Sequence, residues 1–367
     1  MPDDTVPGQP VSRDDMFSGV KTVEERHKLD VGKLTAWLES NVAIFEGPLT
    51  MFQFKGGQSN PTYRLDTPTR RYVLRRKPFG KLLPSAHAVD REFRVISALH
   101  NVGFPAARPY GICSDDSVIG SMFYVMEMVS GRIFWDGALP TLKTAERRAI
   151  YDAEIETLAQ LHNYDPGAIG LGDYGKPGNY FARQIERWSK QYRASETQQV
   201  PSMEKLMEFL PRTVPKQERV SVVHGDYRLD NMIFDASEAK VKAVLDWELS
   251  TLGDPLADFS YFLMLWEMPP AKASAGSSGI AGLDLAALGI PTIDEASAHY
   301  CKLTGRSGIP DLDWYFAYNM FRIAAILQGI AGRLRDGTAA SAQAVETVKR
   351  IVPLADAAWR FAKKSGA

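Results

Sequence analysis

The chain has 367 residues, of which 45% are hydrophobic and 24% are charged, and its formal net charge at pH 7 is −1. This composition is ordinary for a soluble globular protein, and the near-neutral charge argues against a dominant nucleic-acid-binding surface. The two cysteines, Cys113 and Cys301, lie far apart without metal-ligand spacing, which favours free thiols in a reducing cytoplasm.

The sequence gives no sign of a targeting or membrane segment. The N-terminus is acidic and contains prolines, without the basic start and apolar run of a signal peptide. The longest apolar run, near residues 262–266, is far shorter than the roughly 20 residues that cross a bilayer. We therefore expect a cytoplasmic protein with no membrane or nucleic-acid partner, whose residues 1–20 are disordered.

The first third of the chain is predicted to contain a small antiparallel sheet with helices. Apolar spacing fits helices at residues 30–44 and 88–99. Because the β-type runs between and after these helices are short and separated by Gly, Asn and Pro, they predict strands. These strands are expected at residues 50–54, 62–65, 72–75 and 121–128. We expect residues 21–128 to form an N-terminal lobe.

The remainder is predicted to be mainly helical, so that residues 129–367 form a C-terminal lobe. A compact β segment at residues 220–247 interrupts the helices, and the composition of residues 269–279 is that of a loop. Helices are expected at residues 145–162 and 181–192, and from residue 256 onward. The predicted fold class is α+β.

Two motifs in the β segment point to phosphoryl transfer. Residues 224–231 read His-Gly-Asp-Tyr-Arg-Leu-Asp-Asn, and Asp246 follows Asp226 by 20 positions within Val-Leu-Asp-Trp-Glu. Phosphoryl transfer depends on alignment and charge neutralisation rather than on covalent help from the protein. The spacing predicts Asp226 as the base beside an acceptor hydroxyl, with Asn231 and Asp246 as ligands of Mg²⁺. The alternative is that each aspartate only ends a turn or a strand, and it is disfavoured because both motifs occur in order.

Two residues near these motifs resemble residues that support the loop in kinase-like folds. For His224 the resemblance implies that it holds the loop through backbone contacts and takes no part in the chemistry. Asp258, which follows Asp246 by 12 positions, resembles the aspartate that caps a helix and anchors this loop, which implies that it accepts hydrogen bonds from backbone N–H groups.

Two backbone segments of the N-terminal lobe are candidates for binding ATP. Glu127 and Met128 end the strand 121–128, where backbone N–H and C=O groups can read the adenine edge. A Gly-rich turn between two strands can bring amides and side-chain donors to phosphate oxygens, although many such turns are simple hairpins. This turn contains Gly56, Gly57, Ser59 and Asn60.

Arg75 stands where protein kinases carry the lysine that holds the ATP phosphates. Arginine keeps its charge and can bind phosphate through two nitrogens. Strand alternation directs Arg76 to the opposite face. Glu92, on the following helix, is the expected ion-pair partner of Arg75, and the alternative is that Glu92 is solvated.

Together these residues resemble the aminoglycoside phosphotransferase family over about residues 40–360. Gly225 replaces the arginine of the protein-kinase motif, and Asp-Trp-Glu replaces Asp-Phe-Gly. The resemblance implies a two-lobed protein-kinase-like fold, with a small antiparallel-sheet N-lobe and a mainly helical C-lobe, that uses ATP and Mg²⁺. Residues 74–78 and 321–329 resemble the branch associated with acyl-CoA dehydrogenases, which implies a functional link to such an enzyme.

The acceptor is a small molecule whose identity the sequence leaves open. From Phe262 to the end, 11 Lys and Arg residues stand against 9 Asp and Glu residues. This balance favours a neutral or anionic hydroxylated acceptor, such as a hydroxyacyl-CoA thioester or a related acid, over an aminoglycoside. Arg322, Gln328 and Arg333 lie on one predicted helix and are candidates to face the acceptor, with core packing or solvation as alternatives. An aminoglycoside kinase and a catalytically silent nucleotide-binding partner of an acyl-CoA dehydrogenase are the alternative functions.

Overall fold

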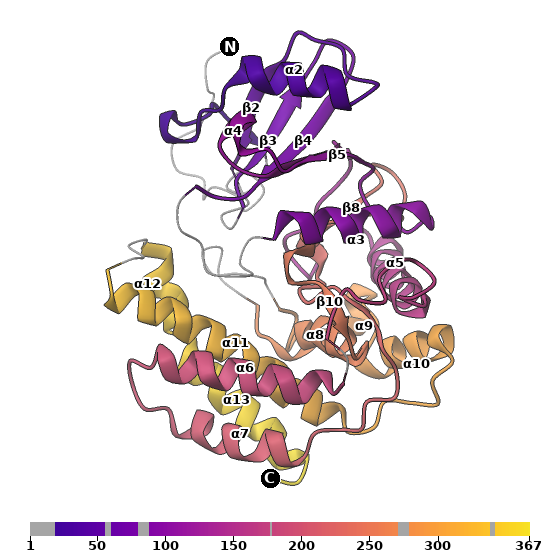
Figure 1. Cartoon of the computed structure of the whole chain (residues 1–367). Helices are drawn as coiled ribbons and strands as arrows, with labels where there is room; N and C mark the ends of the chain where they lie inside the picture. The colour runs from indigo at the N-terminus through magenta and orange to yellow at the C-terminus, as the bar shows by residue number, and fades with distance from the viewer. Residues whose placement is uncertain (1–18, 56–59, 80–87, 177, 271–278, 338–341) are drawn as a thin grey trace, which may run out of the picture. The chain divides into compact units, whose positions relative to one another are not determined.

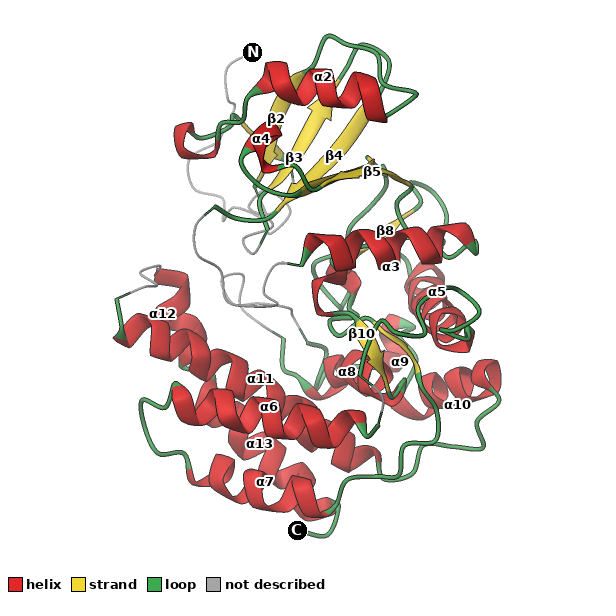
Figure 2. Ribbon diagram, viewed as in Figure 1, coloured by secondary structure: helices red, strands yellow, loops and turns green. Residues whose placement is uncertain are grey.

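The structure is a computed structural model, and it divides into two compact units, Met1–Ser130 and Gly131–Ala367 (Figure 1). The first unit combines a sheet with short helices, and the second is mainly helical (Figure 2). The predicted α+β class is therefore confirmed. The structure describes residues 19–55, 60–79, 88–176, 178–270, 279–337 and 342–367.

The sheet of the first unit has six strands in the order β1-β2-β3-β4-β6-β5, and each neighbouring pair is antiparallel. The strands are β1 (Val20–Lys21), β2 (Thr50–Phe54), β3 (Thr62–Asp66), β4 (Arg71–Arg76), β5 (Pro109–Cys113) and β6 (Phe123–Glu127). Val20 pairs with Phe54, so regular structure begins slightly before the expected limit at residue 20.

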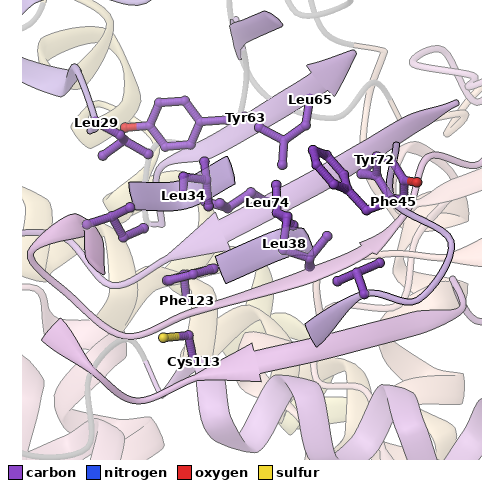
Figure 3. Close-up of a cluster of buried hydrophobic side chains, with 13 residues drawn as sticks. Leu29, Leu34, Leu38, Phe45, Tyr63, Leu65, Tyr72, Leu74, Cys113 and Phe123 are labelled. Atoms are coloured by element: carbon purple, nitrogen blue, oxygen red, sulfur yellow. The ribbon is translucent and has the colours of Figure 1, made fainter. Parts of the chain in front are cut away.

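Two helices cover opposite faces of this sheet, as the alternation of side chains along β4 shows. The helices of the unit are η1 (Glu25–His27), α2 (Val31–Asn41), α3 (Val89–Asn101) and α4 (Asp116–Ile119). Leu34 and Leu38 of α2 pack in one cluster with Tyr72 and Leu74 of β4 (Figure 3). Arg75, the next residue of β4, points to the other face, because successive side chains of a strand alternate. On that face Arg75 pairs with Glu92 of α3.

The second unit is built around α11 (Leu312–Arg335), which packs against α6, α8 and α13. Most of its side chains are buried, as expected for a helix that is surrounded by others. The other helices are α5 (Thr144–Asn163), α6 (Tyr180–Ala194), α7 (Pro201–Arg212), α8 (Leu256–Glu267), α9 (Leu285–Leu288), α10 (Ile293–Thr304), α12 (Ala342–Val348) and α13 (Ile351–Lys364).

Two short antiparallel strand pairs carry the catalytic motifs. Strand β7 (Ser221–Val223) pairs with β10 (Thr251–Gly253), and β8 (Met232–Phe234) pairs with β9 (Val241–Val244). The 3-10 turns η2 (Leu229–Asn231) and η3 (Trp247–Leu249) lie directly beside these strands.

Among the described residues, no helix combines the length and the apolarity that a membrane span requires.

Candidate active site

The β8–β9 hairpin brings the two sequence motifs together. Met232 is the Cα partner of Val244, and the Leu245 amide donates a hydrogen bond to the Asn231 carbonyl at 2.8 Å. Asn231 therefore precedes β8, and Asp246 follows β9, at the same end of the hairpin. Residues that are 15 positions apart in the sequence thus become neighbours.

The loop from His224 to Asp226 is anchored by Asp258 on α8. The two carboxylate oxygens of Asp258 accept hydrogen bonds from the backbone amides of His224, at 2.5 Å, and of Gly225, at 2.8 Å. The His224 ring bonds to the Leu245 carbonyl through Nε2 at 2.7 Å, and its Nδ1 accepts from the Asp226 amide at 3.2 Å. Because a carbonyl only accepts, these contacts require the tautomer that is protonated on Nε2. His224 and Asp258 therefore have the contacts of supporting residues.

Position 225 must be glycine in this loop. Gly225 has φ +87°, and a Cβ there would lie 2.8 Å from the Leu249 carbonyl oxygen. Its own carbonyl accepts a hydrogen bond from the buried Arg322 guanidinium of α11. A side chain at position 225 would be both strained and blocked.

Asp226 is held by three polar side chains. The Tyr261 hydroxyl donates to Oδ1 at 2.7 Å, Asn231 Nδ2 donates to Oδ2 at 3.1 Å, and Arg228 Nε lies 3.3 Å from Oδ2. Burial raises the pKa of Asp226, but the Arg228 charge and the Tyr261 hydrogen bond lower it more, so the pKa lies below its ordinary value. Asp226 is therefore an oriented, ionised carboxylate at neutral pH.

Asn231 and Asp246 form a donor set that suits Mg²⁺. The Asn231 amide nitrogen donates to the carbonyl and carboxylate oxygens of Asp226, at 2.9 and 3.1 Å, so the Oδ1 atom of Asn231 is the one available to a metal. Asp246 adopts a left-handed conformation, with φ +63°, where the chain turns into η3. In the described part of the chain, no cluster of three or more His, Cys, Asp or Glu residues is placed to hold a metal. One amide oxygen and one carboxylate still fit Mg²⁺, which takes its other ligands from phosphates and water.

Asp226 lies in the wall of a cavity of about 340 Å³ that is formed entirely by residues of the second unit. The walls are largely apolar and include Trp135, Phe262 and Ile323. The ionisable residues that line it are Glu154, Asp226, Arg228, Asp230, Arg322 and Arg350. Such a mixture of apolar walls and a few polar groups is typical of a small-molecule site.

The three arginines of the cavity differ in their partners. Arg228 pairs with Asp226 and with Asp230, at 3.3 and 3.1 Å. Arg322 bonds to the loop and lies 5.4 Å from the centre of the Tyr261 ring. The Arg350 side chain has no hydrogen bond or ion pair with any residue of the described ranges, and burial lowers its pKa. Arg350 therefore offers a guanidinium group to a ligand.

Two of the predicted acceptor residues lie away from the cavity. Gln328 is fully buried and donates to Ser195 O and Thr197 Oγ1 at 2.7 and 2.9 Å, so it fixes the end of α6 and does not line the cavity. Arg333 lies three turns beyond Arg322 on α11, is exposed, and does not line the cavity either. Of the three predicted residues, only Arg322 lines the cavity.

Sequence analysis did not identify Glu154, Tyr261 or Arg350 as part of this site. Of the charged cavity residues that were not predicted, Arg228 and Asp230 could have been found from the sequence, because they lie within the motif 224–231. The other three come from distant segments and meet only in the folded chain.

In the first unit, Arg75 and Glu92 form the predicted ion pair, with Nε and Oε2 3.1 Å apart. Glu92 is buried and also accepts from Asn60 Nδ2 at 2.9 Å and from the Tyr124 hydroxyl at 3.0 Å. Arg76 points away and bonds to Ser121, as alternation requires. The Asn60 side chain is thus engaged within the unit. The other residues predicted for this turn, Gly56, Gly57 and Ser59, lie outside the described residues.

The predicted adenine-reading segment is the end of β6. The Glu127 amide donates to the Arg108 carbonyl at 2.8 Å, so that N–H is already used. The prediction therefore depends on the Glu127 carbonyl and the Met128 amide.

Comparisons with known proteins identify the family of the chain. The model of the phosphotransferase enzyme family matches residues 51–290. The mouse (Mus musculus) protein named acyl-CoA dehydrogenase family member 10 is 46% identical over 320 residues, which are 87% of this chain and 30% of that protein. This chain spans less than half the length of the curated relatives that it matches.

Solved structures show the same fold. A crystal structure from Ralstonia eutropha, of a protein assigned by name to the aminoglycoside phosphotransferases, is 51% identical with a TM-score of 0.84. The match covers 92% of this chain and 99% of that one. A ternary complex of the aminoglycoside phosphotransferase APH(4)-Ia with ADP and hygromycin B is 16% identical, with a TM-score of 0.56 and coverage of 89% and 97%.

Proposed function

This chain belongs to the phosphotransferase enzyme family, and on that premise we propose that it transfers the γ-phosphoryl group of ATP to a hydroxyl group of a small anionic metabolite. The preferred acceptor is a hydroxyacyl-CoA thioester or a related hydroxy acid. The observation that carries the proposal is the oriented Asp226 carboxylate in the wall of a cavity that also contains the unpaired Arg350 guanidinium.

Asp226 is proposed to orient the acceptor and to take its proton. As the acceptor oxygen forms a bond to the γ-phosphorus, the bond between that phosphorus and the ADP oxygen breaks, and the hydroxyl proton passes to the carboxylate. Tyr261 and Asn231 each donate to a different oxygen of Asp226, which fixes the plane of the carboxyl group. Orientation of this kind supplies most of what phosphoryl transfer needs from a protein.

Asn231 Oδ1 and the Asp246 carboxylate are proposed to hold Mg²⁺. When bound, the metal neutralises charge on the phosphates. In the first unit, Arg75 is proposed to contact the ATP phosphates while Glu92 holds it in place, and the segment at Glu127 and Met128 is proposed to contact adenine.

The charges of the cavity support an anionic acceptor. The Arg228 charge is offset by Asp226 and Asp230, whereas Arg350 has no counter-charge among the residues that the structure describes. A partly buried charge without a partner is unfavourable, so a carboxylate or phosphate of a ligand would stabilise this end of the cavity. A CoA thioester supplies such anionic groups, and its use would link the protein functionally to an acyl-CoA dehydrogenase.

The test is to incubate the protein with ATP, Mg²⁺ and a panel of hydroxyacyl-CoA thioesters, free hydroxy acids, choline and kanamycin, and to identify products by mass spectrometry. We expect a phosphorylated thioester or acid, and no product with Asp226→Asn. Arg350→Met should raise the KM for that acceptor while leaving the KM for ATP unchanged. Efficient phosphorylation of kanamycin or choline alone would refute the anionic acceptor, and ATP binding without any product would favour a silent nucleotide-binding protein.

A further inference from the structure

Glu154 is a buried carboxyl group in the wall of the cavity whose side chain is not satisfied within the protein. It lies on α5 and is 0% exposed, and neither carboxyl oxygen has a hydrogen-bond partner in the described ranges. Its backbone carbonyl accepts a hydrogen bond from the Tyr227 hydroxyl at 2.8 Å. Since Tyr227 follows Asp226, this turn of α5 lies directly behind the catalytic loop.

Other deeply buried carboxyl groups of the chain do have partners. Glu92 is bonded to Asn60 and Tyr124 and paired with Arg75, while Asp258 accepts two backbone amides. Asp254, at a helix start, accepts the Leu256 amide at 2.9 Å. Glu154 therefore differs from these buried carboxyl groups, because its carboxyl oxygens lack a hydrogen-bond partner among the described residues and it lies in the wall of the cavity.

Burial and the nearby Asp230 carboxylate raise the pKa of Glu154 well above its ordinary value, which favours the protonated, neutral form of the side chain. A neutral carboxyl group has one O–H to donate and oxygen lone pairs to accept. Leaving such a group unsatisfied in the interior costs about 1–3 kcal/mol. An apolar residue of the same size would avoid this cost, which points to a role in binding.

We propose that Glu154 is the residue by which the cavity selects acceptors that carry an uncharged oxygen, such as a carbonyl, in addition to the hydroxyl that is phosphorylated. This inference rests on the proposed phosphotransfer to a small acceptor and specifies which acceptors fit. A carboxylate of the acceptor would be repelled by Asp230 at this wall and belongs near Arg350. An uncharged oxygen can take the O–H of Glu154, and the apolar walls pack against the carbon chain.

Three isomers of hydroxybutyryl-CoA, with the hydroxyl at C2, C3 or C4, are tested first. The probe is the isomer that the wild-type protein phosphorylates fastest. It is compared with the thioether analogue in which a CH₂ group replaces the carbonyl. We expect the wild type to show a KM for the analogue that is about 5- to 150-fold higher, as the loss of one buried hydrogen bond implies. Glu154→Gln, which keeps a neutral donor and acceptor, should retain most of this preference.

Glu154→Met should lose the preference, with a raised KM for the thioester, an unchanged KM for ATP, and a melting temperature equal to or above that of the wild type. A purely structural carboxyl group would instead lower the melting temperature and leave the preference intact, which would overturn the inference. Equal losses in both variants would mean that a neutral donor at position 154 does not preserve the preference, which would also overturn the inference.

Glu156→Gln is the matched control, because Glu156 is exposed on the same helix and does not line the cavity. If the wild type phosphorylates none of the isomers, the proposed acceptor class fails together with this inference. If it phosphorylates one isomer and its thioether analogue equally well, only this inference fails.

Discussion

Replacement of Tyr261 by Phe removes one hydrogen bond from the proposed base and leaves the ring in place. The hydroxyl donates to Asp226 Oδ1 at 2.7 Å in a buried setting, and a hydrogen bond to a charged group contributes about 1.5–3 kcal/mol. This bond stabilises the ionised form of Asp226 and so lowers its pKa. At about 1.36 kcal/mol per pH unit, its loss should raise the pKa of Asp226 by about 1 to 2 units.

The sign of the effect on activity follows from the protonation state. The ionised carboxylate accepts the proton, so activity is present above the pKa of Asp226 and is lost as the pH falls through it. Because Tyr261→Phe raises that pKa, the acid limb of the kcat/KM profile should move to higher pH, while the rate on the alkaline plateau changes less.

The measurement is the pH dependence of kcat/KM for the acceptor at saturating ATP and Mg²⁺, in the wild type and in Tyr261→Phe. Tyr174→Phe is the matched control, because it removes a buried hydroxyl that bonds to Ser250 Oγ at 2.7 Å rather than to Asp226. An acid limb that stays in place in Tyr261→Phe, or that moves equally in Tyr174→Phe, would refute the assignment of Asp226 as the titrating base.

Three further predictions test the remaining parts of the site. Asp226→Asn should lower kcat by about 10²–10⁴-fold or more and leave ATP binding nearly intact by calorimetry, and a parallel loss of binding would contradict its role at the acceptor. Asp246→Ala should raise the Mg²⁺ concentration that is needed for ATP binding, and an unchanged Mg²⁺ dependence would exclude it as a ligand. Arg75→Met and Glu92→Gln should show a coupling of about 0.5–3 kcal/mol in the free energy of ATP binding, whereas additivity would mean that the ion pair does not hold the phosphate-binding side chain.

The sequence was sufficient to predict the features that depend on local patterns of residues. Alternation along β4 placed Arg75 and Arg76 on opposite faces, and the ion pair of Arg75 with Glu92 is present in the structure. The order of the two motifs likewise predicted that Asn231 and Asp246 belong to one site, and a tight hairpin brings them together. In each case the spacing along the chain nearly fixes the spacing in the fold.

The acceptor side depends on packing between distant helices, which spacing does not determine. Helix α11 is buried on most sides, so its hydrophobic pattern does not show which face meets a cavity and which meets α6. For this reason the sequence did not show that Gln328 bonds to the end of α6 and does not line the cavity. Glu154 and Arg350 come from α5 and from the turn before α13, and no local pattern connects them with the motif 224–231.

Arg322 of α11 is bonded to the loop at Gly225. The loop turns through φ +87° against the Leu249 carbonyl, so position 225 has no room for a side chain. Arg322, 97 residues further along the chain, donates a hydrogen bond to the carbonyl of this glycine. Because Arg322 also lines the acceptor cavity, α11 ties the cavity wall to the loop that carries Asp226. A shift of α11 would therefore change acceptor binding and the position of the base together, and loss of the Arg322 side chain should affect both kcat and the KM for the acceptor.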